Sequence, residues 1–439
     1  MNTKFLGGLI IVFLLALVAR VSSLGAINQV VFDEVHFGKF ISSYCCTHER
    51  FFDIHPPIGK LLIAGGAYVV GYDGQFSFDH IGQPYENVPI AEIRMVPAIF
   101  GALLPVIIMI LLVQAGVSLE LSFMGGIALA FENALIVESR YILTDSILLA
   151  ATFGCVSAAI AAVQTKHSLR SWYWVILAGI LAGIAVGTKF TGAIGGALAG
   201  VVLLVQAIRD GYMKSGIWFG KISLLVGTVG AVYIAGWALH FSLLTLPGSG
   251  DVWGVPTGHF WQDVVQTHQK MLSANYNLTA DHPYGSKWYT WPFMVRSVFY
   301  WQGGGNQFLY LLGNPIVWWG SAAFSAVGLL YAFTLIARGI FTKTNAVAWV
   351  FLLGYILSFI PLMRVPRVLF LYHYLTPLLF SLLFGVWWFD KAVGLKRRIV
   401  AAACLVLIAA GFLFMSSLTY GFPVSQELQH VLFYISSWR

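Results

Sequence analysis

The sequence predicts an all-α integral membrane protein with about eleven transmembrane helices. Of its 439 residues, 59% are hydrophobic and only 10% are charged, whereas a soluble domain carries roughly 25% charged residues. The mean hydropathy is +0.80. A water-soluble fold of this length could not hide so much apolar surface, so lipid must cover much of it. The net charge of +7 does not indicate nucleic-acid binding, because the basic residues lie in short connections between apolar runs.

Eleven apolar runs have the length of about 17–25 residues that a membrane-spanning helix needs. A further run, 58–71, is shorter, follows a Pro-Pro pair and contains Lys60, which predicts a helix lying at the membrane interface. The first run is interpreted as a retained signal-anchor, because no clear small-residue cleavage site follows Arg20. The eleven runs cover residues 5–24, 91–114, 117–136, 142–163, 171–187, 191–208, 217–241, 313–337, 345–362, 368–389 and 398–418.

Lysine and arginine residues predict the orientation of these helices. If the N-terminus is inside, the positive-inside rule places the C-terminus and two long segments, 25–90 and 242–312, outside. Both segments are rich in aromatic residues, histidine and proline, and we expect them to be ordered. We divide the chain into an N-terminal catalytic region, 1–241, the second outer loop, 242–312, and a C-terminal four-helix region, 313–439. The inner connections then hold Lys166, Arg170, Arg209, Lys214, Arg338, Lys343, Lys391, Lys396, Arg397 and Arg398.

Ionisable residues that could perform chemistry concentrate on the predicted outer side. Such residues are costly at membrane depth and usually serve a function. A transporter would hold them near the midplane, often with repeat symmetry, so the one-sided clustering indicates an active site at the outer surface, with a substrate that enters from the lipid. The cluster comprises Asp33, Glu34, His36, Asp53, His55, Glu138, Arg140, Asp145, Lys189, His282, Arg296, Arg364, Arg367 and His373.

Two of these sites have a structural interpretation beside the functional one. The adjacent carboxylates Asp33 and Glu34 cannot face the same way on a helix, so one could face a cavity while the other makes a local contact. Alternatively, Asp33 caps a helix N-terminus. Arg140 suits a phosphate, because a guanidinium is always charged and makes fork-like contacts. Equally, it could form a salt bridge with Glu138 or Asp145.

The four cysteines show no metal-binding spacing. Cys155 and Cys404 lie in apolar runs and are expected to be inert. Cys45 and Cys46 are adjacent in a polar loop, where two free thiols are the expected state. A vicinal disulfide or a pairing with another chain is the alternative.

Six segments, taken in chain order, resemble the protein O-mannosyltransferases, which belong to the integral-membrane glycosyltransferases with the GT-C fold. Any one of these segments would be a weak match, but six in the family's order, all facing one side, are specific. They extend over nearly the whole chain. The segments are FDEVHFGKF (32–40), FFDIHPPIGKLL (51–62), ESRYILTDSILL (138–149), HPYGSKWYTWPF (282–293), LLGNPIVWW (311–319) and RVPRVLFLYHYLTPLLF (364–380).

The resemblance implies an inverting transfer of mannose from a polyprenyl (dolichyl) phosphate mannose lipid to Ser or Thr hydroxyls of exported proteins. The reaction would occur at the extracytoplasmic face of the plasma membrane, and the translocon is one place where the acceptor polypeptide could be met. Asp33 would act as the general base, with Glu34 as the second catalytic carboxylate. The donor phosphate would contact Arg140, Arg364, Arg367 and Lys189. Substrate-binding residues would be His55, Glu138, Asp145, His282, Tyr284, Trp291, Tyr372 and His373.

The same resemblance implies no metal or other cofactor, since the donor has one phosphate and enough cations are nearby. One departure is visible: eukaryotic members carry a β-trefoil MIR domain in the second outer loop, and 242–312 has no room for one. The chain therefore resembles the shorter prokaryotic-type members. A related GT-C enzyme with another polyprenyl-phosphate sugar or a glycolipid acceptor, such as a lipid A aminoarabinose transferase, is the first alternative. A transporter or lipid flippase is the second.

Overall fold

A computed structural model describes residues 3–165, 168–211, 216–277, 281–338 and 346–439. Within those residues, nine helical runs are long and apolar enough to cross a membrane, or ten if one bent helix pair is a single span. One of the nine is a 50-residue run that contains both α14 and α15. The helices in these nine runs are α1 (Thr3–Val21), α4 (Ile90–Gln114), α7 (Asp145–Gln164), α8 (Leu169–Thr188), α9 (Ala193–Arg209), α10 (Gly216–Leu243), α12 (Pro315–Ala337), α13 (Ala346–Phe359), α14 (Leu375–Val393) and α15 (Arg397–Tyr420).

The predicted run 117–136 is the bent pair, α5 (Leu119–Ala130) and α6 (Asn133–Arg140), with an angle of 52° between the two helices. The break has a local cause in Glu132. Its carboxylate accepts the backbone N–H of Leu135 at 2.7 Å and so caps a new helix. The same carboxylate accepts the backbone N–H of Asn314 at 2.8 Å, which ties the bend to the start of α12. Each of the eleven predicted runs thus overlaps a helix, although one of them is not straight.

Helix α7 is the most enclosed of the candidate spans, since 83% of its most apolar 18-residue stretch is buried inside the protein. It packs against α4, α8 and α9. Its many small residues allow this close approach: a Cβ atom added at Gly195 of α9 would lie 3.2 Å from the backbone oxygen of Thr152. Because α8 runs back along α7, the residue after the end of α8, Lys189, lies beside the first residue of α7, Asp145.

The first long segment, between α1 and α4, contains α2 (Glu34–Ser42), the π-helical turn η1 (Ser43–Thr47) and the short apolar helix α3 (Ile58–Val69). The helix predicted for 58–71 is therefore present as α3. Cys45 and Cys46 are joined in a vicinal disulfide, so the expectation of two free thiols was wrong. Both cysteines lie in the tight turn η1, and the backbone of this turn brings their two sulfur atoms together.

The second long segment contains η4 (Ser249–Trp253), α11 (Phe260–Asn277), η5 (Trp288–Phe293) and an antiparallel hairpin of β1 (Val298–Gln302) and β2 (Phe308–Leu311). The chain closes with α16 (Gln426–Leu432) and a 3-10 turn, Ser436–Trp438. Between α13 and α14 lie two further 3-10 turns, η7 (Ile360–Arg364) and η8 (Leu371–Tyr374). Both long segments therefore consist of defined elements.

The two long segments are fastened to each other by backbone and side-chain bonds. The backbone N–H of Phe32 donates to Tyr300 O at 3.0 Å. The guanidinium of Arg50 binds both carboxylate oxygens of Asp251, at 2.6 and 3.0 Å. Together these contacts make one extramembrane layer from residues more than 200 positions apart.

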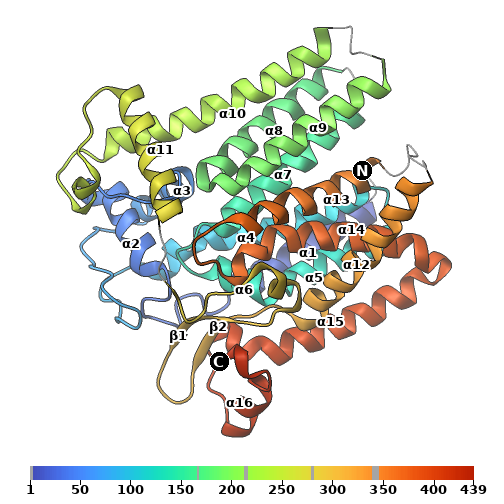
Figure 1. Cartoon of the computed structure of the whole chain (residues 1–439). Helices are drawn as coiled ribbons and strands as arrows, with labels where there is room; N and C mark the ends of the chain where they lie inside the picture. The colour runs from blue at the N-terminus through green and yellow to red at the C-terminus, as the bar shows by residue number, and fades with distance from the viewer. Residues whose placement is uncertain (1–2, 166–167, 212–215, 278–280, 339–345) are drawn as a thin grey trace.

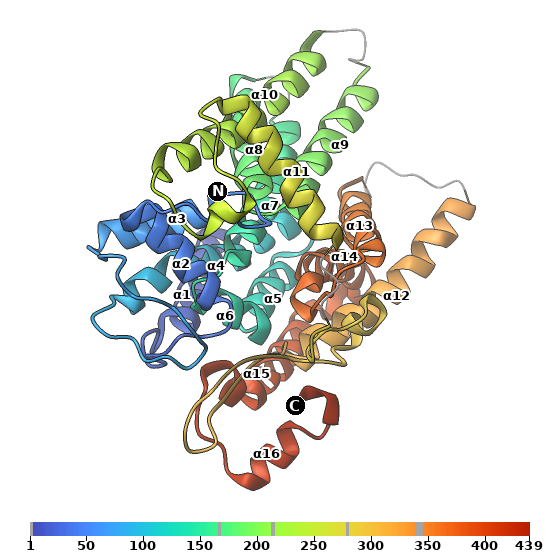
Figure 2. The same cartoon turned by 60° about the vertical axis from the view of Figure 1, so that its left-hand side comes forward.

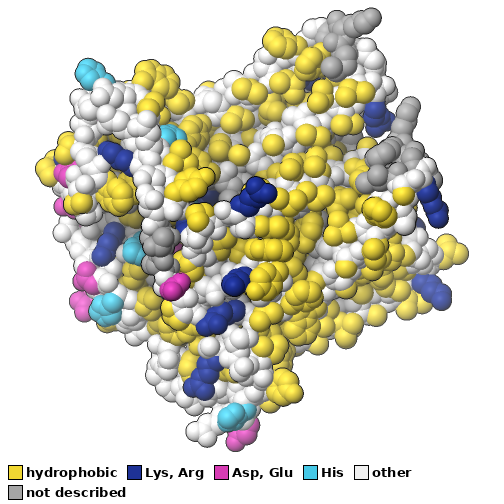
Figure 3. Space-filling view, viewed as in Figure 1, with side chains coloured by type: hydrophobic (Ala, Val, Ile, Leu, Met, Phe, Trp, Pro, Cys, Tyr) yellow, Lys and Arg dark blue, Asp and Glu magenta, His cyan; other side chains and the backbone are white. Residues whose placement is uncertain are grey.

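This layer lies at one end of the helix bundle (Figure 1). α2, α3, α11, the hairpin and the C-terminus lie there, whereas the N-terminus and the starts of α10 and α13 lie at the opposite end. Figure 2 shows the N-terminal helices grouped apart from the C-terminal group α12–α15. In Figure 3, hydrophobic side chains cover the face of the bundle, while the acidic and histidine side chains in view lie over the layer and the C-terminal region. Lys166, Lys214 and Lys343, used in the predicted orientation, lie outside the described residues.

Candidate active site

Asp33 lies where the first long segment turns into α2. The preceding residue, Phe32, has a left-handed φ of 47°, a conformation that a bulky residue rarely adopts and that its surroundings must hold. The holding contact is the ring of Tyr300, stacked on Phe32 at 4.1 Å between centroids. Asp33 occupies the N-cap position of α2, but its side chain makes no capping hydrogen bond. The capping interpretation therefore does not account for the carboxylate.

The Asp33 carboxylate is half-buried among charged neighbours. Burial raises its pKa to about 6, while the charges of His36 and Lys189 act to lower it and those of Asp145 and Asp53 act to raise it. These interactions also show that Asp33, Lys189, Asp145 and Asp53 share one site, although they lie in four separate parts of the chain. A carboxylate with a pKa near neutrality is suited to taking and giving up a proton.

Lys189 is the cation at the centre of this site. Its ammonium pairs with Asp145 at 2.6 Å and lies 5.7 Å from the centroid of the Tyr372 ring. Glu138 lies in the same neighbourhood and accepts a hydrogen bond of 2.5 Å from the Tyr300 hydroxyl. The predicted residues Glu138, Asp145, Lys189 and Tyr372 are thus brought together by the end of α6, the start of α7, the end of α8 and the turn η8.

The loop before α3 supplies another side of the site. Asp53 forms an ion pair with Lys60, whose ammonium also donates to His55 O at 2.8 Å. Burial acts to raise the pKa of Asp53, but the charge and hydrogen bond of Lys60 outweigh it, so the pKa lies below its usual value and Asp53 stays ionised. Burial lowers the pKa of His55 to about 3, which leaves a neutral imidazole at physiological pH.

Arg367 brings an unpartnered guanidinium nitrogen near these groups. Its side chain is half-buried, and its Nε is buried with no hydrogen-bond partner among the described residues. Its charge acts on both His55 and Tyr372. Arg364, the other arginine of this turn, is exposed at the end of η7. Of the two, Arg367 is placed to meet a ligand at the site.

Glu34, predicted as a catalytic carboxylate, is held by five hydrogen bonds inside the protein. It is fully buried and binds the guanidinium of Arg94 at two points, 2.8 and 2.7 Å. Its oxygens also accept the Tyr85 hydroxyl at 3.0 Å and the backbone N–H groups of Val31 and Ile142 at 2.9 and 3.0 Å. With every oxygen occupied, Glu34 has no free lone pair directed at a substrate. The signal that could have found this pair is Arg94 itself, an isolated arginine in an apolar run.

Arg140, predicted to bind the donor phosphate, is also occupied. It is buried, and its Nη atoms donate to the backbone oxygens of Arg20, Ser22 and Ser23 at 2.7, 2.8 and 3.1 Å. Its guanidinium lies 4.7 Å from the centroid of the Tyr420 ring. It forms no salt bridge with Glu138 or Asp145, and its Nε has no hydrogen-bond partner among the described residues. Instead it holds the end of α1, because helix-terminal carbonyls need donors.

Three further predicted residues lie in the packing around the site. Trp291 is fully buried and donates from Nε1 to Ser286 Oγ at 2.9 Å. His282 is exposed, and its Nδ1 accepts the Tyr284 backbone N–H at 3.2 Å. The Tyr284 ring stacks on Phe299. These contacts stabilise the second long segment and leave none of the three side chains beside Asp33.

His373 lies nearer to the site. Its ring stacks on Tyr372 at 4.6 Å between centroids, and its Nδ1 lies 3.1 Å from the backbone N of Phe370. Through Tyr372 it contacts the group around Lys189. Tyr300, which no sequence motif indicated, joins the site through Phe32 and Glu138. Only its partners in space identify it.

The arrangement combines a carboxylate able to accept a proton with a fixed ammonium and a partly unpartnered guanidinium. Such a set can deprotonate a hydroxyl while it stabilises an anionic leaving group.

Two family models match this chain. Residues 10–245 match the family described as dolichyl-phosphate-mannose-protein mannosyltransferase, and residues 260–438 match the C-terminal four-helix region of protein O-mannosyltransferases. Mannosyltransferase 4 of Candida albicans is 35% identical over 261 residues, which are 56% of this chain and 34% of that protein. Protein O-mannosyltransferase 1 of Drosophila melanogaster is 36% identical over 248 residues, 54% of this chain and 28% of that protein. The chain thus spans about a third of the length of these relatives.

Solved structures share the fold. The Saccharomyces cerevisiae protein O-mannosyltransferase Pmt1-Pmt2 complex bound to the sugar donor superposes with a TM-score of 0.92 at 21% identity, over 100% of this chain and 93% of that one. ArnT from Cupriavidus metallidurans bound to undecaprenyl phosphate gives 0.52 at 14% identity, over 97% of this chain and 76% of that one. The predicted GT-C membrane fold is confirmed. Since the first family match alone covers more than half of the chain, the protein belongs to the dolichyl-phosphate-mannose-protein mannosyltransferase family.

Proposed function

We propose that this protein transfers mannose from a polyprenyl phosphate mannose lipid to Ser or Thr hydroxyls of polypeptides. The observation that carries the proposal is the free carboxylate of Asp33, which makes no capping bond and lies beside Lys189 with a pKa near 6. A hydroxyl is a poor nucleophile until a base removes its proton. Asp33 is the carboxylate of this site that no ion pair or hydrogen bond among the described side chains occupies.

The reaction follows from this placement. The Ser or Thr oxygen attacks the anomeric carbon of mannose from one face, and the bond from that carbon to the phosphate oxygen breaks on the other. The hydroxyl proton passes to Asp33, and the electron pair of the broken bond leaves with the lipid phosphate. Lys189 and Arg367 supply positive charge for the leaving phosphate. Because attack and departure occur on opposite faces, the anomeric configuration inverts.

The two substrates reach the site from different sides. The donor enters from the lipid along the bundle, and the acceptor enters from the extramembrane layer that both long segments form. We place this layer on the extracytoplasmic side of the plasma membrane, where exported polypeptides emerge. The basic residues at the opposite end of the bundle support this orientation.

The test is a transfer assay with purified protein in detergent, labelled polyprenyl phosphate mannose and a Ser/Thr peptide. Asp33→Asn should lower the rate about a hundredfold or more, because the amide cannot accept the proton. The matched control is Glu86→Gln, an exposed carboxylate of the same long segment. Since burial disfavours the ionised Asp33, Asp33→Asn should not lower the melting temperature at pH 8. Normal transfer by Asp33→Asn, or no transfer to any peptide by the unaltered protein, would refute the proposal.

A further inference from the structure

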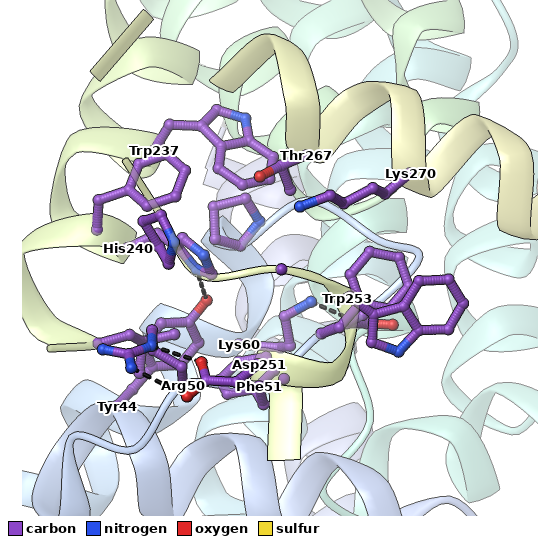
Figure 4. A pocket seen from close by; sticks show the side chains of 18 of the residues that line it. Tyr44, Arg50, Phe51, Lys60, Trp237, His240, Asp251, Trp253, Thr267 and Lys270 are labelled. Atoms are coloured by element: carbon purple, nitrogen blue, oxygen red, sulfur yellow. Dashed lines mark hydrogen bonds and ion pairs between the residues drawn. The ribbon is translucent and has the colours of Figure 1, made fainter. Parts of the chain in front are cut away.

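A pocket lies beside the site, between the loop before α3, the end of α10 and the segment from η4 to α11 (Figure 4). In the close view, Trp237 and His240 approach it from α10, and Thr267 and Lys270 approach it from α11. Asp53 and His55 belong to its lining. Asp53 also acts electrostatically on Asp33, and Lys189 and Arg367 act on His55, so the pocket borders the candidate active site at these two residues.

The charges in the pocket do not cancel. Arg50 is paired with Asp251, and Lys60 is paired with Asp53. Lys270 remains as a cation for which no ion pair is present among the described residues. Its Nζ lies close to Gly254, since a Cβ atom added there would be 2.9 Å from it. This ammonium would attract an acidic ligand. Because the lysine is half-buried, salt screens its charge less than that of a surface lysine.

Much of the remaining lining is aromatic and comes from the loop before α3, from η4 and from the last turns of α10. The rings of Phe52 and Trp253 stack at 4.3 Å between centroids at one side of the pocket, and the buried Trp237 lies at another. Aromatic walls with a few fixed polar groups suit side chains of a polypeptide. Because η4 and α11 of the extramembrane layer supply part of the lining, a polypeptide that meets this layer is a suitable occupant.

We propose that this pocket binds the acceptor polypeptide next to the Ser or Thr that receives the sugar, and that Lys270 selects segments with an acidic side chain there. The inference rests on the proposed function, since it assigns a subsite to the acceptor of that reaction. The border at Asp53 and His55 then couples acceptor binding to the position of the hydroxyl at Asp33.

The experiment uses sets of three Ser/Thr peptides that carry an acidic, a neutral or a basic residue at one position and are otherwise identical. This position is varied from set to set on both sides of the hydroxyl. The unaltered protein should prefer the acidic peptide over the basic one by about fivefold or more in kcat/KM at the best position. Lys270→Glu should reverse this order, and Lys270→Gln should abolish it. The KM for the donor should stay unchanged in both variants. The matched control is Lys287→Glu, an exposed lysine of the same long segment outside the pocket, which should keep the original order.

Two results would overturn the inference: the same peptide order in Lys270→Glu as in the unaltered protein, or a change confined to the donor KM. The latter would assign the pocket to the donor. Binding of the fluorescent acidic peptide, measured by anisotropy without donor, is a second readout that needs no turnover. If the unaltered protein transfers no sugar, the proposed function fails. Even then, weaker binding of the acidic peptide to Lys270→Glu than to the unaltered protein would support the pocket as a peptide-binding site. Equal binding to both proteins would reject it.

Discussion

Glu34 and Arg94 form a fully buried ion pair with two contacts, 2.8 Å from Nε to Oε1 and 2.7 Å from Nη2 to Oε2. Arg94 also donates to the backbone oxygens of Ile27 and Gln29, at 2.8 and 3.1 Å. The pair thus ties the start of α2 to α4 and to the chain that follows α1. Since Asp33 immediately precedes Glu34, the buried pair fixes the position from which the Asp33 carboxylate projects.

The first prediction concerns this pair. Removing one partner leaves a buried charge without compensation, which costs about 3–5 kcal/mol. Arg94→Ala should therefore lower the melting temperature strongly, and Glu34→Gln should also lower it. Thermal unfolding of the purified variants in detergent measures this, with Glu86→Gln as the exposed control. If Glu34→Gln melts like the unaltered protein but transfers no sugar, then Glu34 acts in the chemistry after all.

The second prediction is the pH dependence of transfer. Because the pKa of Asp33 is raised to about 6, its carboxylate is protonated below that pH and cannot accept a proton. We expect kcat/KM to fall about tenfold per pH unit as the pH decreases below about 6. If Asp33 had the ordinary pKa of about 3.9, kcat/KM would stay unchanged down to pH 5. A flat profile between pH 7 and pH 5 would contradict the assignment of Asp33 as the base.

The third prediction separates two arginines. Arg367, with its unpartnered Nε, should contact the donor phosphate, so Arg367→Ala should raise the donor KM. Losing a charge that faces a phosphate costs on the order of 2–5 kcal/mol. Arg367→Lys should restore only part of the activity, because lysine lacks the planar fork. The measurement is donor kinetics at saturating acceptor.

Arg140 provides the comparison, because its Nη atoms donate to backbone oxygens, although its Nε, like that of Arg367, has no hydrogen-bond partner among the described residues. Arg140→Ala should lower the melting temperature while the donor KM of the folded fraction stays near normal. The reverse pattern, with donor kinetics altered by Arg140→Ala and not by Arg367→Ala, would return the phosphate contact to Arg140.

The fourth prediction is topological. We expect a single cysteine at position 287, in the second long segment, to react with a membrane-impermeant maleimide in intact cells. A cysteine at position 168, between α7 and α8, should react only after the cells are permeabilised. Both positions are exposed in the protein, so access to the reagent depends on the side of the membrane. Labelling of position 168 alone in intact cells would invert the orientation and place the candidate site inside.

Much of the fold could be read from the sequence because the membrane imposes a strong local constraint. An apolar run of sufficient length must be helical to satisfy its backbone in lipid, and each predicted run overlaps a helix. The motifs around Asp33, Asp145 and Lys189 were likewise visible as charged residues next to apolar runs. The break after Ala130 could not be read in this way, since an apolar run of spanning length does not show that Glu132 caps a new helix and also accepts the backbone N–H of the distant Asn314.

The role of each charged side chain was decided only by the tertiary structure. Asp33 and Glu34 are neighbours with nearly the same chemistry, yet Arg94, 60 positions away, occupies one carboxylate and leaves the other free. Arg140 and Arg367 were equivalent candidates by residue type, and the carbonyls at the end of α1 distinguish them. Composition and spacing determine which residues are available for chemistry near the membrane surface. Partners far apart in the chain determine which lone pairs and protons remain unused, because a group already satisfied by the protein has little left to offer a substrate.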